Sequence, residues 1–453
     1  MMTTAKTYTV AEVMDGVTVG PTLFRVVGLC FLLMVCDSYD VSALSYAAPT
    51  LIRDWRISPG SMGLIFGVGL SGLLVGSIVL GQLGDRIGRK KSIVLGALAF
   101  SLLTAATGLA QSGWQLAGLR FVAALGLGGA VPNAVALCGE FSPVRLRATT
   151  VGVIFAGYSI GGIVAGIVAA SAVPAWGWSS LFFIGGALST ATTLLLAKLL
   201  PESLNVTSRT PGRSTEATRL ASKLRPDLQI GQGAIIVPDD GSAKPGTRLT
   251  DLFAGRLAVA TPLMWAIYVA SSLTIFSLVS WLPAAVEAIG LSRSSSAVAL
   301  ALLFMGSAIG GIVGGRMLDR FGLPAIVGMA LAAIPAVSGI GTFAAGETAL
   351  MLTSLLAGCF AFGTQTSLHG FVATLYPAEV RAAGVGWAIG VAKLGSIAGP
   401  IIGGSLLGRV SSAALFIAAA TPMAVVVLLA LVLHAHLAAW HKRSAPSTGS
   451  ATA

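Results

Sequence analysis

The most informative shortage in this sequence is charge. Asp, Glu, Lys and Arg make up 10% of the 453 residues, whereas hydrophobic residues make up 55%. A soluble domain carries about 25% charged residues, so this chain lacks the polar groups that cover a surface facing water. The sequence therefore predicts a membrane protein with many spans. Its apolar runs are continuous, which excludes the alternating pattern of a transmembrane β-barrel.

Cysteine is scarce as well, and the four cysteines are scattered through apolar runs without a metal-ligand or disulfide spacing. No grouping of Ser, His and Asp residues predicts a catalytic site. We therefore expect no metal, no cofactor and no enzymatic activity. The net charge of +11 indicates basic loops beside a membrane rather than binding to nucleic acid.

Twelve apolar stretches reach the length of about 20 residues that a bilayer-crossing helix needs. Six of them precede, and six follow, a polar stretch rich in Pro, Ser, Thr and charged residues. The predicted spans are 24–48, 61–80, 92–110, 116–138, 149–170, 179–199, 258–282, 298–316, 324–343, 349–372, 384–407 and 412–436.

These spans define the expected domains of an all-α membrane protein. We expect an N-terminal six-helix half over 1–200, a cytoplasmic central loop over 201–256, a C-terminal six-helix half over 257–437 and a cytoplasmic tail over 438–453. In the central loop, "EATRLASKLRPDL" predicts a short amphipathic helix lying on the inner membrane surface.

Basic residues are distributed unevenly over the loops. With the N-terminus inside, the outer segments contain only Arg53, Arg56, Arg293 and Arg409, and most other Lys and Arg residues fall in inner segments. An excess of Lys and Arg marks cytoplasmic loops. We therefore expect both termini in the cytoplasm and the protein in the inner, cytoplasmic membrane.

The two halves repeat one another at a constant offset of 234 residues. "GQLGDRIG", which begins at Gly81, aligns with "GRMLDRFG", which begins at Gly315. "PVRLRATTVG", which begins at Pro143, aligns with "PAEVRAAGVG", which begins at Pro377. Two six-helix halves related in this way are typical of transporters, in which substrate binds near the membrane midplane and access alternates between the two sides.

The same motifs carry a family resemblance. "GQLGDRIGRKK" after the second span and "LPES" after the sixth resemble signatures of the major facilitator superfamily. "DSYD" in span 1, "LRFVAALGLGGAVPNAVALCGEFSP" in span 4 and "GVGWAIGVAKLGSIAGPIIGG" in span 11 resemble the aromatic acid:proton symporter family. That resemblance implies the major facilitator fold and the import of benzoate-type acids. Three positions depart from the usual family pattern: Ser38 replaces Gly, His369 replaces Asn and Lys393 replaces Arg.

Charges inside the spans distinguish the halves. Asp37 and Asp40 are three residues apart, which places both on one helix face, and their counterparts in the repeat are Ser271 and Thr274. Because the loop motifs repeat and these charges do not, the pair is expected to serve function rather than the scaffold. Two carboxylates this close in a low dielectric do not both ionise readily, so we expect them to bind and release a proton or to position substrate.

Three further polar residues in the spans are candidates, each with an alternative. Lys393 supplies a positive charge either for a substrate carboxylate or for a salt bridge to Asp37 or Asp40. Arg120 takes part in proton coupling, as the resemblance implies, or extends its side chain to the membrane interface. His369 contacts a substrate hydroxyl or titrates, or it is a packing residue.

A second set of charges lies at the inner face, where ion pairs are expected to control conformation rather than to contact substrate. A Glu at the end of span 4 is placed to meet an Arg of the loop between spans 2 and 3. The set comprises Asp85, Arg86, Arg89, Glu140 and Arg147 in the first half and Asp319 and Arg320 in the second.

These observations predict a proton-coupled secondary transporter that imports a small organic anion, most specifically an aromatic carboxylate, by alternating access. The expected partners are the anion, protons and the lipid bilayer, and we expect a monomer to be functional. The alternative on the same fold is a proton-driven exporter of drugs or metabolites. Exporters tend to have a Gly-Pro motif in span 5, which is absent here, and an exporter of cations would not need Lys393.

Overall fold

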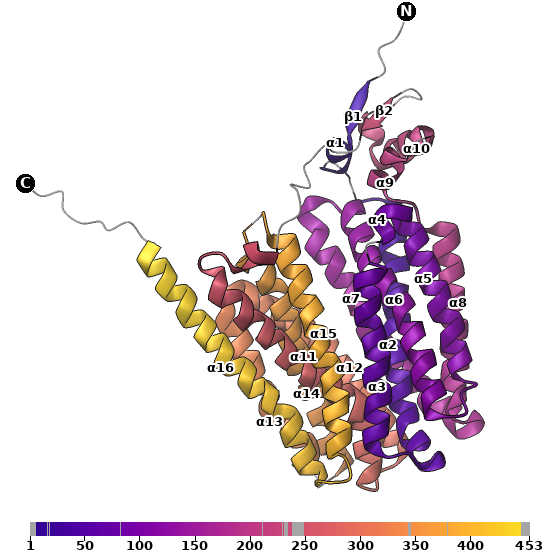
Figure 1. Ribbon diagram of the computed structural model, residues 1–453, viewed down its shortest axis with the longest axis vertical. Helices are drawn as coiled ribbons and strands as arrows, with labels where there is room; N and C mark the ends of the chain where they lie inside the picture. Colours follow the sequence, from indigo (N-terminus) through magenta and orange to yellow (C-terminus); the bar gives the residue numbers. More distant parts are fainter. Residues whose placement is uncertain are drawn as a thin grey trace, which may run out of the picture. The chain divides into compact units, whose positions relative to one another are not determined.

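A computed structural model describes residues 6–444, except 16, 18, 82, 211, 229, 231–233, 238–248, 343–345 and 378. Twelve helices of this described part are long and apolar enough to cross a membrane, as the sequence predicts. Figure 1 shows them as two sets of long helices. They are α2 (Pro21–Asp54), α3 (Pro59–Val79), α5 (Arg89–Thr107), α6 (Gly113–Phe141), α7 (Arg147–Trp176), α8 (Ser179–Leu199), α11 (Leu257–Ala288), α12 (Arg293–Phe321), α13 (Leu323–Thr342), α14 (Glu347–Leu375), α15 (Arg381–Leu406) and α16 (Ser412–Ser444).

The chain forms two compact units. The first consists of Met1–Pro245 together with Leu282–Ala301, and the second of Gly246–Trp281 together with Leu302–Ala453. The C-terminal end of α11 and the N-terminal end of α12 therefore group with the first unit rather than with the rest of their own helices. Within that unit, Tyr46 of α2 donates a hydrogen bond to the carbonyl of Ala297 at 3.3 Å, and Arg293 donates to Thr50 at 3.2 Å.

Close helix contacts repeat at the same offset as the sequence motifs. A Cβ atom on Gly72 of α3 would overlap the carbonyl oxygen of Phe121, and one on Gly306 of α12 would overlap that of Leu355. Glycine lets two transmembrane helices approach to backbone contact, which strengthens van der Waals packing where no hydrophobic force draws helices together. The repeat is therefore a repeat of packing geometry as well as of loop motifs.

The contact between the first and fifth spans of each unit is also repeated. A Cβ atom on Gly161 of α7 would overlap the carbonyl oxygen of Val35, and one on Gly395 of α15 would overlap that of Val269. In the first unit, Ser38 lies in this contact, with its Cβ 2.9 Å from the position that a Gly161 Cβ would take. A side chain fits at residue 38 because residue 161 has none.

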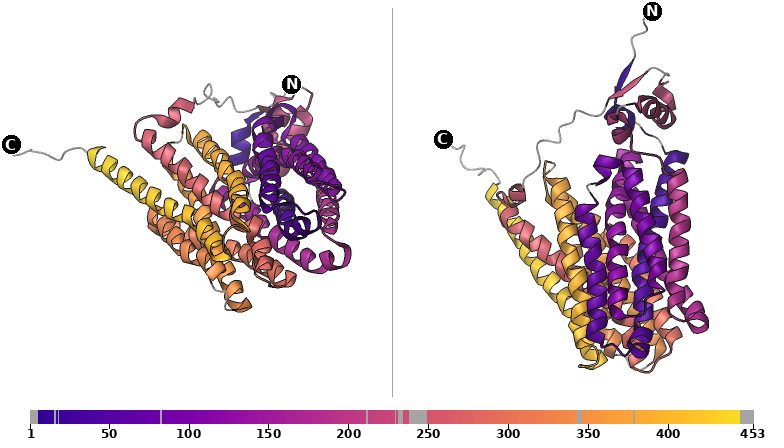
Figure 2. Two further views of the ribbon diagram at one scale, coloured as in Figure 1. Left: turned by 60° about the horizontal axis from the view of Figure 1, so that its bottom comes forward. Right: turned by 45° about the vertical axis from the view of Figure 1, so that its right-hand side comes forward.

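A small folded element extends one end of the first unit, as Figure 1 and Figure 2 show. It contains β1 (Thr7–Thr9), α1 (Val10–Asp15), α9 (Leu204–Arg209), α10 (Ser214–Leu224) and β2 (Ile235–Val237). The two strands pair in parallel, with Thr7 opposite Ile235. Short strands need an apolar face to pack against. Here that face is continuous with the core at the N-terminal end of α2 and the C-terminal ends of α6 and α8.

Side chains join the N-terminal segment to the central loop. Arg225 donates to the carbonyls of Glu12 at 3.1 Å and Val13 at 3.5 Å, near the C-terminal end of α1, where positive charge is favoured. The carboxylate of Asp227 holds the Arg225 guanidinium in place, with Oδ2 lying 2.7 Å from Nη2. Tyr8 donates to the carbonyl of Leu228 at 3.4 Å.

The amphipathic helix of the central loop is present as α10, but its role differs from the expectation. Its apolar face, formed by Ala217, Ala221 and Leu224, is buried in the small folded element. Protein rather than lipid therefore covers this face. Sequence periodicity identified the amphipathic helix but could not identify what covers it.

The repeated glycine contact predicts a stability difference between two positions of α15. Gly395→Ala should lower the melting temperature, because the added methyl group forces α15 away from α11 at a cost of about 1–3 kcal/mol. Gly390 has open space around its Cα, so Gly390→Ala is the matched control and should leave the melting temperature unchanged or slightly higher. Thermal unfolding of the purified protein in detergent measures both. Equal melting temperatures would contradict the close contact.

Candidate functional site

The two aspartates of span 1 lie on α2, and both are buried in the first unit. Asp40 is bound by the guanidinium of Arg120, whose Nη1 donates to Oδ1 and Nη2 to Oδ2, each at 2.5 Å. This bidentate geometry is the strong form of an Arg–carboxylate contact. The structure thus joins two of the residues that the sequence analysis considered separately.

Arg120 lies in the second turn of α6, and only 5% of its surface is exposed. It does not extend to the membrane interface, so that alternative is wrong. Its guanidinium also lies 5.9 Å from the ring centre of Phe182 on α8, within the range of a cation–π interaction. The charge is therefore held between three helices, by a carboxylate on one side and an aromatic ring nearby.

A third donor reaches the same carboxylate. Thr104 of α5 donates its hydroxyl to Asp40 Oδ1 at 3.1 Å. The phenol of Tyr158 on α7 lies within electrostatic range of both Asp37 and Asp40. Four helices besides α2 thus contribute a side chain to the surroundings of the aspartate pair: α5, α6, α7 and α8.

The corresponding place in the second unit is neutral. The counterparts of Asp40 and Arg120 are Thr274 and Ser354. Thr274 donates its hydroxyl to the carbonyl of Ala419 on α16 at 2.8 Å, so it serves helix packing. The ion pair is therefore an addition to one copy of a shared scaffold.

The second unit contains the other two candidates. Lys393 is half-buried on α15. His369 on α14 is exposed, and its Nδ1 shares a hydrogen bond with the hydroxyl of Tyr268 on α11 at 3.0 Å. The imidazole tautomer decides which of the two groups donates. The bond to Tyr268 fixes the orientation of the imidazole ring.

Aromatic side chains of the second unit gather between α11 and α15. Trp265 and Trp387 are stacked, with ring centres 6.0 Å apart and an angle of 25° between their planes. Phe253 meets the edge of Trp265 at 5.6 Å. Because 47% of Trp387 is exposed, this group offers a flat apolar face for a ring to pack against.

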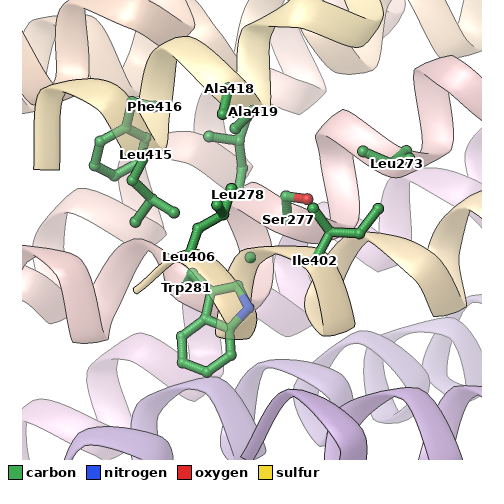
Figure 3. Close-up of a pocket in the computed structure, with 11 residues that line it drawn as sticks. Leu273, Ser277, Leu278, Trp281, Ile402, Leu406, Leu415, Phe416, Ala418 and Ala419 are labelled. Carbon is green, nitrogen blue, oxygen red and sulfur yellow. The ribbon is translucent and has the colours of Figure 1, made fainter. Parts of the chain in front are cut away.

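An apolar hollow in the second unit is not a site for an anion (Figure 3). Leu273, Ser277 and Trp281 of α11 line it together with residues of α15 and α16, and none of its lining residues is charged. The indole nitrogen of Trp281 already donates to the carbonyl of Pro400 at 2.8 Å. Nothing in this lining could compensate the charge of a buried carboxylate.

The inner face contains the ion pair that the sequence analysis expected. Arg89, the first residue of α5, lies 2.6 Å from Glu140 near the end of α6. Arg86 and Arg147 are exposed, as are Asp319 and Arg320 in the second unit. Asp85 lies on α4 (Leu83–Ile87), and its side chain is outside the described part of the structure.

Two residues that the sequence analysis did not select complete this inner site. Glu202, in the "LPES" motif, accepts hydrogen bonds from the backbone nitrogens of Lys90 and Ser203, both at 3.0 Å. A carboxylate at the start of α5 is favoured by the helix dipole. Asn133 of α6 donates to the carbonyls of Gly81 at 3.1 Å and Gly129 at 2.8 Å. The sequence could have indicated Asn133, because an amide side chain is uncommon inside an apolar span.

The buried ion pair predicts a stability defect that a second substitution repairs. Asp40→Asn leaves the Arg120 charge buried without its carboxylate, which should cost about 3 kcal/mol and lower the melting temperature. Asp40→Asn combined with Arg120→Gln removes both charges and should recover most of the loss. Thermal unfolding in detergent tests both variants. Additive losses in the double variant would show that the two residues do not depend on each other.

Comparison with known proteins agrees with this architecture. The chain matches the model of the Major Facilitator Superfamily over residues 30–338 and 264–452. It is 32% identical to the 4-hydroxybenzoate transporter PcaK of Pseudomonas aeruginosa, over 92% of this chain and 94% of that protein. It is also 32% identical to the gallate transporter of Pseudomonas putida, over 84% of each chain.

A solved structure supports the fold alone. The crystal structure of a D-xylose-proton symporter superposes with a TM-score of 0.68 and 16% sequence identity, over 90% of this chain and 97% of that chain. With twelve spanning helices, a repeat of packing contacts and these matches along its length, the chain belongs to the major facilitator superfamily.

Proposed function

We propose that this protein imports aromatic carboxylates of the benzoate and hydroxybenzoate class together with protons. The observation that carries the proposal is the buried Asp40–Arg120 pair beside Asp37, which is present in one unit and absent from its counterpart. Structural repetition does not require these charges. Ionisable groups at membrane depth are costly and mark ion or substrate pathways.

The substrate class follows from the relatives and from the second unit. The relatives are named for 4-hydroxybenzoate and gallate, which share a carboxylate on a flat hydroxylated ring. Lys393 offers a positive charge for a carboxylate, and the Trp265–Trp387 stack offers a face for the ring. The Tyr268–His369 pair offers hydrogen-bonding groups for a ring hydroxyl.

The proposed coupling step is local. A proton that binds the aspartate pair removes negative charge opposite Arg120 and weakens the hold between α2 and α6. Loss of the proton to the cytoplasm restores the negative charge and the contact between α2 and α6. Because α2 and α6 carry the two partners, the protonation state alters the contact between two helices of one unit, which is a means of linking proton binding to alternating access.

The remaining expectations belong to the same proposal. The protein lies in the inner membrane with both termini in the cytoplasm, where the basic loops place them. It acts as a monomer and as a transporter rather than an enzyme, and its work requires no cofactor. The inner-face pair Arg89–Glu140, with Asp85, Arg86 and Arg147 nearby in the chain and Asp319 and Arg320 in the second unit, controls conformation.

Uptake assays test the coupling role of the aspartates. Asp37→Asn should abolish uptake of labelled 4-hydroxybenzoate into proteoliposomes driven by a pH gradient, because the site can no longer exchange a proton. The Asp40→Asn/Arg120→Gln variant should fail in the same way although it folds. Full uptake by both variants would remove the aspartates from the coupling site. Transport of a cationic drug against the same gradient, without uptake of the acid, would favour the exporter instead.

A pair of ligands tests Lys393. Lys393→Ala should weaken binding of 4-hydroxybenzoate about tenfold or more, because a charge-assisted contact is lost, and should affect the neutral 4-hydroxybenzamide far less. Lys393→Arg keeps the charge and should preserve the preference for the acid. Competition against labelled 4-hydroxybenzoate measures the dissociation constants of the acid and of the amide. An equal loss for acid and amide would assign Lys393 a structural role.

A further inference from the structure

Thr104 occupies an unusual place among the hydroxyl residues of α5. It is 1% exposed, and its hydroxyl donates across to Asp40 on α2 at 3.1 Å. Its neighbours Ser101 and Thr107 donate to carbonyls of their own helix, those of Leu98 at 3.0 Å and Leu103 at 2.8 Å. That is the common arrangement for Ser and Thr inside a helix. Thr104 instead directs its proton to a charged group of another helix.

The contact completes the set of donors around one carboxylate. Asp40 Oδ1 accepts from both Arg120 Nη1 and Thr104 Oγ1, and Oδ2 accepts from Arg120 Nη2. Titratable groups within electrostatic range of Asp40 include Tyr158 of α7 and, on α2 itself, Cys36 and Tyr39. Asp37 lies three residues earlier on the same helix. Among these neighbours, Thr104 contributes a neutral hydrogen bond and Arg120 a full positive charge.

We infer that Thr104 is a positioning residue, which aligns the Asp40 carboxylate with Arg120 and sets the pH range over which the coupling site exchanges its proton. A hydrogen bond to the ionised form of a carboxylate stabilises that form over the protonated one. Arg120 binds the carboxylate as a charge, whereas Thr104 fixes its rotation from a third helix. The inference rests on the proposed function, in which Asp40 belongs to the proton-coupling site.

The test compares four versions of the full chain in proteoliposomes. Thr104→Val is nearly isosteric and removes the hydroxyl, Thr104→Ser restores it, and Thr107→Val is the matched control on the same helix. Initial uptake of labelled 4-hydroxybenzoate is measured over a range of external pH with the pH difference across the membrane held constant. We expect the half-maximal point of Thr104→Val to move about one pH unit higher, as the loss of one such hydrogen bond implies. Thr104→Ser and Thr107→Val should follow the wild-type curve.

The outcomes separate the inference from the proposal beneath it. If wild-type uptake is the same with and without a pH difference across the membrane, the proposed function fails. If wild-type uptake follows the gradient and Thr104→Val lowers only the maximal rate, without moving along the pH axis, Thr104 is merely a packing residue and the inference is overturned. Thr104→Ala provides a second removal of the hydroxyl if the Val variant does not fold, and it should shift the curve in the same direction.

Discussion

The absence of water inside a bilayer is the constraint on which this structure depends. A peptide group in hydrocarbon must find its hydrogen-bond partner within the protein, and each helix satisfies its own backbone. The same constraint applies to side chains, and it is severe for a charge. Asp40 and Arg120 meet it together: each is almost completely buried, and each offers the geometry that the other needs. Neither residue would be stable at this depth alone.

The two units show how a shared scaffold is adapted. Glycine contacts between helices occur at equivalent places in both, as Gly161 against Val35 and Gly395 against Val269 illustrate. The charges inside the spans do not repeat. One unit has an ion pair where the other has Thr274 and Ser354, and the second unit has Lys393 where the first has Ser159. Packing is therefore duplicated, whereas chemistry is divided between the copies.

Much of the fold could be predicted from the sequence, because the bilayer thickness sets the length of the apolar spans and the loop charges indicate their orientation. All twelve spans follow from apolar length, and the repeat follows from the loop motifs. Asp40 and Arg120 were selected as charges inside spans, and their functional role stays a prediction. The pairing of Asp40 with Arg120 did not follow, because helical spacing places residues on a face but does not say which helix that face meets. The sequence offered Lys393 as one possible partner for Asp37 or Asp40, and the structure brings Arg120 to Asp40. Thr104 was invisible for a similar reason, since a threonine in an apolar span commonly bonds to its own helix.

The small element at the end of the first unit constrains how the protein is made. β1 pairs with a strand that is synthesised only after six helices have left the ribosome, because Thr7 lies opposite Ile235. Until then, β1 cannot form its parallel pairing. Completion of the pairing joins the end of the first six spans to the N-terminal segment before the second unit is synthesised. The first unit then still lacks Leu282–Ala301, so its packing is completed only when α11 and α12 have been made.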